Sequence, residues 1–176
     1  VSLTQIGGQG VFVKEIEAAI LPREDVRDVL VTRGRVKFEY LPKGAKIGTG
    51  SQRRGAQLKS FMPDLEIVPL RGNIDTRLKK IETENLTGIV LAAAGVKRLG
   101  YSEAVTQFLP TEIMLPAVGQ GALGLQVRKS DAELAGLCAR LNHAVTEAEV
   151  TAERAYLRAL GGGCRLPIAA YGLMEG

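Results

Sequence analysis

The sequence predicts an α/β protein in which helices cover a mostly parallel sheet. Short apolar stretches alternate with amphipathic stretches along the 176 residues. Residues 88–94 form an almost wholly apolar run, which is typical of a central strand buried on both faces of a parallel sheet. Many of the 21 glycines stand in pairs or triplets where these stretches end. Glycine is favoured there because the backbone turns sharply or closely approaches another group.

The predicted elements are mostly strands that alternate with helices. Residues 11–20 have the period of an amphipathic helix, which Leu21-Pro22 ends. Ser51 is placed to cap a following helix. The remaining predictions are strands at 45–48, 65–70, 88–94 and 122–127, and helices at 52–61, 75–81, around 97–98, 131–141 and 150–160.

The positive charge of the chain is concentrated in one block. The formal net charge is +4. Between residues 48 and 98 there are nine lysines and arginines and five acidic residues, an excess of four, so the rest of the chain is neutral overall. Aromatic residues make up 5% and tryptophan is absent, so the stacking surface of a nucleic-acid binder is missing. The block favours a carboxylate or phosphate ligand over nucleic acid.

A glycine-rich turn opens this basic block. Thr49 and Ser51 lie in the turn, and Arg53 and Arg54 follow in the first turn of the predicted helix 52–61. Free backbone N–H groups, the helix dipole and two guanidinium groups would converge there on one anion. The spacing and the lysine of a phosphate-binding P-loop are absent. A capped helix with a solvated basic turn explains the same residues equally well.

Three further arginines stand near the ends of predicted strands. Arg71 and Arg77 follow the strand 65–70, and Arg98 follows the strand 88–94. Because the carboxyl ends of parallel strands share one edge, these side chains would enter one crevice. Arginine suits the bidentate recognition of carboxylates and phosphates. The alternative for each arginine taken alone is an ordinary surface charge.

The two cysteines have different surroundings. Cys164 follows three glycines and precedes Arg165, which would favour a reactive thiolate; a buried small residue is the alternative. Cys138 lies among leucines of a predicted helix, where filling the core is the expected role. The only histidine, His143, has no partner for a catalytic triad in the sequence. Two cysteines do not indicate a disulfide framework, which favours a reducing, cytoplasmic setting.

Taken together, these segments closely resemble the porphobilinogen deaminase (hydroxymethylbilane synthase) family. The resemblance covers nearly the whole chain and is carried by many ordered matches. These are IGGQGVFVKE at 6–15, RED at 23–25 with Asp28, GTGSQRRGAQL at 48–58, LRGNIDTRL at 70–78, LAAAGVKRLG at 91–100, LPAVGQGA at 115–122, and ERAYLRALGGGCRLP at 153–167.

The resemblance implies a transferase of tetrapyrrole (heme or chlorophyll) biosynthesis. It would join four porphobilinogen molecules head to tail with release of ammonia, giving hydroxymethylbilane. The growing chain would be held on a dipyrromethane cofactor attached to Cys164 by a thioether, and no metal is implied. The positions that match the family's cofactor-binding residues are Thr49, Ser51, Arg53, Arg54, Arg71, Arg77 and Arg98.

The resemblance also implies an architecture. Two periplasmic-binding-protein-like (type II) domains would enclose a cleft, and a small α+β third domain would carry the cysteine loop. The expected division is 1–26 with 116–142 for domain 1, 27–115 for domain 2 and 143–176 for domain 3. We expect a cytoplasmic monomer, or a stromal one in a plastid, whose partner is porphobilinogen and which binds neither nucleic acid nor membrane.

The sequence departs from the family in several places. The family's catalytic aspartate lies in a His-Ser-(Leu/Met)-Lys-Asp-x-Pro motif, expected here between Ile20 and Leu21, and the motif is absent. No catalytic residue is therefore assigned. The family's N-terminal strand and the end of its third domain also have no counterpart, which suggests a fragment or a chain with segments left out. Gln5 and Gln9 stand where relatives often carry lysine. A non-catalytic, periplasmic-binding-like anion-binding module is the alternative function, because it would share the crevice and the arginines without needing the Gly-Gly-Gly-Cys loop.

Overall fold

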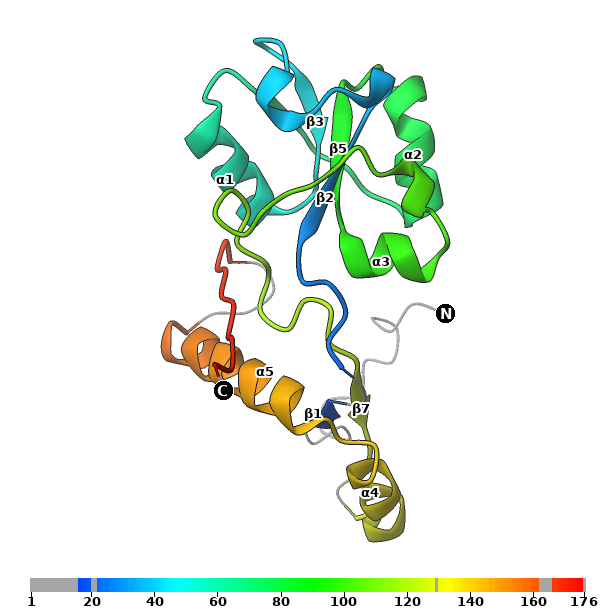
Figure 1. Cartoon of the computed structure of the whole chain (residues 1–176), viewed down its shortest axis with the longest axis vertical. Helices are drawn as coiled ribbons and strands as arrows, with labels where there is room; N and C mark the ends of the chain where they lie inside the picture. Colours follow the sequence, from blue (N-terminus) through cyan, green and yellow to red (C-terminus); the bar gives the residue numbers. More distant parts are fainter. Residues whose placement is uncertain (1–15, 20–21, 129, 162–165, 176) are drawn as a thin grey trace.

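A mixed five-stranded sheet forms the centre of one lobe of the molecule, which comprises residues 28–115 (Figure 1). The computed structural model describes residues 16–19, 22–128, 130–161 and 166–175. The strand order in the sheet is β4-β3-β5-β2-β6. The strand bounds are β2 Asp28–Thr32, β3 Lys46–Gly48, β4 Glu66–Val68, β5 Gly88–Ala92 and β6 Gln107–Phe108.

One strand of the sheet runs against the direction of the others. β3 runs parallel to both β4 and β5, whereas β2 is antiparallel to both β5 and β6. The predicted strands at 45–48, 65–70 and 88–94 are confirmed with shorter bounds, but β2 and β6 were not predicted. The sheet is therefore mixed: β4, β3, β5 and β6 run in one direction, as a mostly parallel sheet predicts, and β2 runs in the opposite direction. β5 is nevertheless the central strand, as its unbroken apolar run predicts.

Helices cover both faces of this sheet (Figure 1). Helix α1 (Gln52–Phe61) lies on one face, and α2 (Ile74–Thr83) and α3 (Ala93–Arg98) lie on the other. Successive residues of β5 separate into two apolar clusters, because side chains alternate across a strand. Val90 packs with Leu58 of α1, while Ile89 packs with Ile81 of α2. Three short 3₁₀ turns complete this lobe, at Arg33–Arg35, Phe38–Tyr40 and Ser102–Ala104.

Two connectors lead from the sheet to the rest of the chain. The first connector is residues 22–27 and the second is residues 116–123. Beyond them, β1 (Ile16–Ala19) pairs antiparallel with β7 (Gly124–Gln126), and α4 (Ala132–Ala139) and α5 (Ala144–Ala159) follow. The predicted helix 11–20 is wrong over residues 16–19, because these form β1 through pairing with β7; residues 11–15 and 20 lie outside the described residues.

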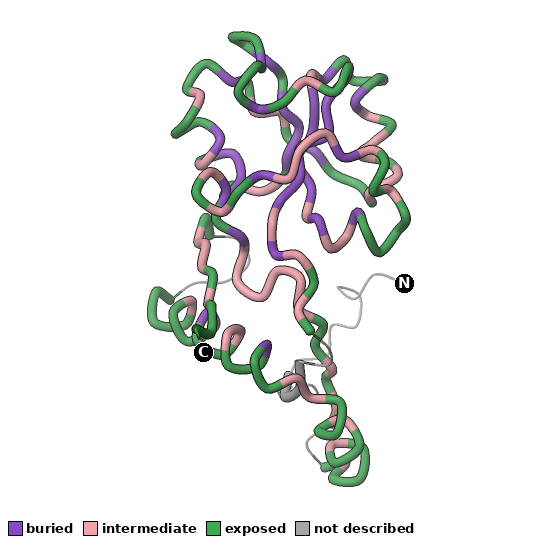
Figure 2. The backbone as a smooth tube through the Cα atoms, viewed as in Figure 1, coloured by how far each residue is buried: buried purple, intermediate pink, exposed green. Residues whose placement is uncertain are grey.

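Helix α4 has an exposed apolar surface. It contains no buried residue, and Leu134, Leu137 and the adjacent Leu141 are 43%, 53% and 55% exposed. Figure 2 shows the contrast between this helix and the buried strands of the sheet. Cys138 is only partly buried, so the prediction that it fills a core is wrong. Helix α5 begins earlier than the predicted 150–160, with His143 as its N-cap.

Candidate anion-binding site

The strand directions bring basic and acidic residues to one edge of the sheet. The parallel strands β3 and β5 end at this edge, and the antiparallel β2 begins there. Asp28, the first residue of β2, is therefore the register partner of Ala92 at the end of β5. The turn after β3 leads into α1, so the start of that helix faces the same edge.

The start of α1 has the cap that the sequence predicts. The Ser51 hydroxyl accepts a hydrogen bond from the backbone N–H of Arg54 at 3.4 Å, and the Ser51 N–H donates to Thr49 Oγ1 at 3.2 Å. A Cβ at Gly50 would lie 2.6 Å from the carbonyl oxygen of Leu70. This close approach requires glycine, and it holds the turn against the segment that follows β4.

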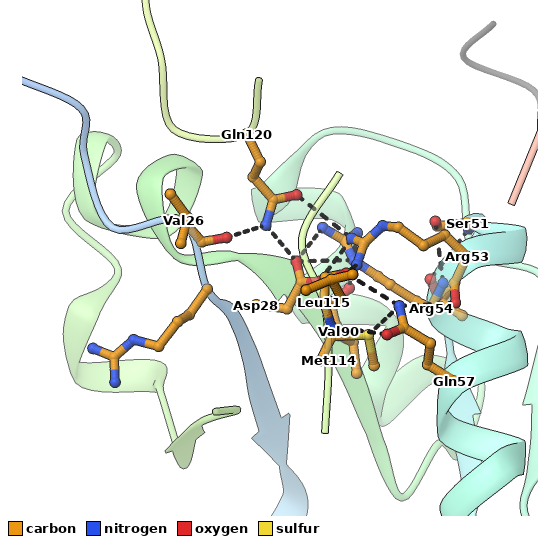
Figure 3. Close-up of polar contacts among 12 residues, drawn as sticks. Val26, Asp28, Ser51, Arg53, Arg54, Gln57, Val90, Met114, Leu115 and Gln120 are labelled. Carbon is orange, nitrogen blue, oxygen red and sulfur yellow. Dashed lines mark hydrogen bonds and ion pairs between the residues drawn. The ribbon is translucent and has the colours of Figure 1, made fainter. Parts of the chain in front are cut away.

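Arg53 and Arg54 converge on the carboxylate of Asp28 (Figure 3). Arg53 Nη2 lies 2.7 Å from Oδ2, and Arg54 approaches Oδ1 with Nη2 at 2.7 Å and Nε at 3.1 Å. Gln120 Nε2 donates to the same Oδ1 at 3.0 Å. Burial lowers the pKa of Arg53 below its usual value, and the charge of Asp28 opposes that shift. Two cations against one buried anion leave a net positive charge at this point.

A pocket of about 570 Å³ opens beside this cluster. Five of the predicted site residues line it: Ser51, Arg53, Arg54, Arg71 and Arg77. Gly50, Gln52, Leu70 and Leu166 complete the lining. The structure thus brings the turn and the two arginines after β4 to one crevice, whereas Arg98, predicted to reach the same crevice, does not line it.

The two outer arginines differ in how they are held. Arg77 is half-buried and its Nε donates to the carbonyl oxygen of Gly72 at 2.7 Å. Its pKa is lowered, chiefly by burial and secondly by the nearby charge of Arg54. Arg71 is exposed and has no hydrogen-bond or ion-pair partner among the described residues. These arginines can therefore meet an anion that enters from solvent.

Not every predicted site residue reaches the pocket. Thr49 is buried in the turn, and Arg98 is exposed at the end of α3; neither lines the pocket. Gln5, Gln9 and Cys164 lie outside the described residues. Leu166, two positions after Cys164 in the sequence, does line the pocket.

Sequence reasoning missed two residues of the cluster. In the sequence, Asp28 and Gln120 stand out only as members of segments that match the family. The available signal was a charged residue at the start of the apolar stretch DVLVT, all five residues of which are buried. A buried carboxylate needs partners, so Asp28 pointed to arginines elsewhere in the chain.

A second charged cluster ties α5 to the connectors. The Glu153 carboxylate accepts hydrogen bonds from Arg23 Nη1 and Nη2 at 2.7 and 3.0 Å. It also accepts from the backbone N–H groups of Gly119 and Gly172, at 2.6 and 2.8 Å. A cavity of about 510 Å³ lies next to Arg23, and its charged lining residues pair with other residues of the chain.

Neither a metal centre nor a membrane span is found in the described part of the chain. No group of three or more histidines, cysteines, aspartates or glutamates is placed there to hold a metal ion. None of the described helices combines the length and apolar character needed to cross a bilayer.

Solved structures with a similar chain path superpose on this chain only with low TM-scores. One is a periplasmic binding protein of Salmonella typhimurium with high arginine specificity, at a TM-score of 0.41 and 19% identity over 76% of this chain and 61% of that one. Another is a mutant of ArgBP from T. maritima, at a TM-score of 0.38 and 15% identity over 80% and 55% of the two chains.

Curated relatives match throughout the sequence. Porphobilinogen deaminase of Syntrophus aciditrophicus is 50% identical over 204 residues, covering 100% of this chain and 67% of the relative. The proteins of the same name from Geotalea uraniireducens and Bacillus subtilis are each 46% identical, covering 100% of this chain and 64% and 65% of the relatives. The chain thus spans about two thirds of the length of these relatives.

Two family profiles also match. "Porphobilinogen deaminase, dipyromethane cofactor binding domain" matches residues 17–136, and "Porphobilinogen deaminase, C-terminal domain" matches residues 147–176. The first match alone covers more than half of the chain, and it contains the whole arginine pocket apart from Leu166. The chain therefore belongs to the porphobilinogen deaminase family.

Proposed function

We propose that this chain supplies the pyrrole-binding pocket and the attachment loop of a hydroxymethylbilane synthase. The complete enzyme joins four porphobilinogen molecules head to tail and releases ammonia at each addition. The observation that carries the proposal is the pocket in which Ser51, four arginines and Leu166 meet. Pyrroles of this pathway bear acetate and propionate groups, and arginine is the side chain best suited to bind several carboxylates.

The chemistry of the pocket fits a dipyrromethane cofactor. Arg71 and Arg77 would bind carboxylates at the open side, while Arg53 and Arg54 offer positive charge at the closed side. Ser51 adds a hydroxyl group, and Leu70 and Leu166 add apolar surface for the pyrrole rings. When bound through Cys164, the cofactor supplies the pyrrole position onto which the next unit is added. The chain's own residues hold the carboxylates and orient the rings.

The proton-transferring carboxylate is not assigned to any described residue. Asp28 is unsuitable, because its carboxylate is fully buried and ion-paired with two arginines. The match to the Syntrophus protein extends over 204 residues, whereas this chain has 176, a difference of 28. That difference supports the proposal that the segment with the family's catalytic aspartate is left out after Ile20. We expect such a chain to bind pyrrole carboxylates but to turn over slowly or not at all.

The family resemblance also gives the wider organisation that we propose. Domain 1 comprises residues 1–26 and 116–142, domain 2 residues 27–115, and domain 3 residues 143–176. Arg98 and Thr49 remain proposed cofactor contacts, although neither lines the pocket in this structure. The protein is proposed to act as a cytoplasmic monomer, without nucleic acid or membrane as a partner.

A covalent-adduct experiment tests the proposed function. Purified chain is incubated with porphobilinogen and, separately, with hydroxymethylbilane, then denatured and treated with an acidic aldehyde reagent for pyrroles. We expect a coloured adduct and a matching mass increase, both lost in Cys164→Ser and kept in Cys138→Ser. An adduct that persists in Cys164→Ser contradicts the attachment site. Tight anion binding without any adduct, from either pyrrole, supports a non-catalytic anion-binding module instead.

A further inference from the structure

We infer that Asp28 is a positioning residue of the anion pocket, which fixes Arg53 and Arg54 in the orientation that a carboxylate ligand meets. The inference rests on the proposed function, in that it takes the pocket to bind carboxylates. It assigns a role to Asp28, an acidic residue that lies behind the arginines of a pocket for acidic ligands. The role is to orient the cations rather than to contact the ligand.

The geometry shows how completely the arginines depend on this carboxylate. Asp28 has no exposed surface and accepts four hydrogen bonds, three of them from the two guanidinium groups and one from Gln120. Arg53 and Arg54 are only 5% and 9% exposed, yet both line the pocket. Asp28 itself does not line it. The carboxylate therefore lies behind the arginines, on the side away from the ligand.

Backbone contacts complete the restraint on both arginines. Arg53 Nη1 donates to the carbonyl oxygen of Leu115 at 2.5 Å, and Arg54 Nη1 lies 3.4 Å from that of Val90. These carbonyl groups belong to different segments, so each guanidinium is held between Asp28 and a second fixed point. Arginine loses considerable rotamer freedom when it is ordered. When the arginines are already ordered, this loss of side-chain entropy no longer opposes ligand binding.

Positioning and simple electrostatics predict opposite effects of removing the Asp28 charge. Electrostatics alone predicts tighter anion binding in Asp28→Asn, because one negative charge near the pocket disappears. Positioning predicts weaker binding, because the amide group of asparagine presents N–H donors to two guanidinium groups that have only donors. At least one arginine must then turn away. Because both side chains are almost buried, we propose that the loss of orientation dominates.

Binding of citrate, a tricarboxylate probe, by titration calorimetry at constant ionic strength tests this inference. We expect Asp28→Asn to bind citrate about tenfold more weakly than the wild-type chain. The matched control is Glu153→Gln, which also neutralises a buried carboxylate paired with arginine but lies outside the pocket. That variant should lose stability while its citrate affinity stays within about twofold. A purely structural role for Asp28 would give both variants the same pattern.

A second pair of variants keeps the inference testable if Asp28→Asn does not fold. Gln120→Met removes the neutral hydrogen bond to Asp28, together with weaker support of Arg53 and a bond to Val26. The matched control is Gln107→Met, which removes hydrogen bonds with Phe38 and Glu39 and touches neither Asp28 nor the two arginines. We expect about threefold weaker citrate binding in the first variant and unchanged binding in the second. Unchanged or tighter binding in Asp28→Asn, or in Gln120→Met if the former is unfolded, overturns the inference but leaves the proposed function standing. Failure of the wild-type chain to bind citrate overturns both.

Discussion

Arg23 of the first connector and Glu153 of α5 form a two-point ion pair, with both guanidinium Nη atoms within 3.0 Å of the carboxylate. Their side chains are 6% and 1% exposed. The same carboxylate accepts backbone hydrogen bonds from Gly119 of the second connector and from Gly172 near the C-terminal end. One glutamate therefore joins four segments that are far apart in the sequence.

Neutralising Glu153 should destabilise the protein. In Glu153→Gln, Arg23 would stay buried with only the longer contact to Glu149, so we expect the free energy of unfolding to fall by about 3 kcal/mol. Urea denaturation at neutral pH, followed by circular dichroism, measures this change. Glu149→Gln is the control, because Glu149 lies 3.7 Å from the same Arg23 Nη1 and makes a weaker contact. An equal loss in the two variants would contradict the central role of Glu153.

Adding a methyl group at Gly50 should disturb the turn before α1. The new Cβ would lie 2.6 Å from the Leu70 carbonyl oxygen, so Gly50→Ala should cost about 1–3 kcal/mol and weaken citrate binding. Gly136→Ala is the matched control within a helix, since its new methyl group would have no neighbouring atom within 4 Å. That variant should gain about 0.5–1 kcal/mol from helix propensity. Thermal unfolding compares the two, and a stable Gly50→Ala with full citrate affinity would refute the close approach.

Arginines inside and outside the pocket should differ in their effect on ligand binding. Arg77 lines the pocket and Arg98 does not. We expect Arg77→Met to weaken citrate binding about tenfold, because a direct charge-assisted hydrogen bond is lost. Arg98→Met should change it less than about twofold, through distant charge alone. Titration calorimetry measures the citrate affinity of both variants. A larger loss of affinity in Arg98→Met than in Arg77→Met would show that Arg98 contacts the ligand.

Asp25 should contribute an acid-sensitive part of the stability. Its pKa is lowered below the ordinary 3.8, first by the hydrogen bond from the Arg27 side chain and also by the Arg27 backbone N–H and the charge of Lys97. The folded state therefore favours the ionised form, and this stabilisation exists above pH 3.8 and disappears as the pH falls through the lowered pKa. Asp25→Asn should lose a few tenths of a kcal/mol near neutral pH, since the Arg27 side chain is 43% exposed and water screens the pair.

The comparison across pH checks the origin of that effect. Urea unfolding of the wild-type chain and Asp25→Asn is measured near neutral pH and at about pH 2.5, below the ordinary aspartate pKa. We expect the difference in unfolding free energy to shrink at the lower pH. A difference of the same size at both values would mean that the hydrogen-bond geometry, rather than the charge of Asp25, stabilises the connector.

Local features were predictable from the sequence, and features set by distant pairing were not. The Ser51 cap and the bounds of α1 follow from residues within one helical turn, and the structure confirms both. By contrast, residues 16–19 form a strand only because β7, more than 100 positions later, pairs with them. The role of Asp28 could not be predicted for the same reason. Its partners lie 25 and 26 positions away, and its place depends on β2 running opposite to β5.

The position of Arg53 has a consequence for how the lobe is built into the chain. Its guanidinium contacts Asp28 and Leu115, the residues at which the chain enters and leaves the five-stranded lobe. The first and last residues of the lobe are therefore close in space, and the Arg53 side chain, which belongs to the lobe, bonds both of them. Units whose two ends lie close together are the ones that proteins tolerate as insertions into a longer chain.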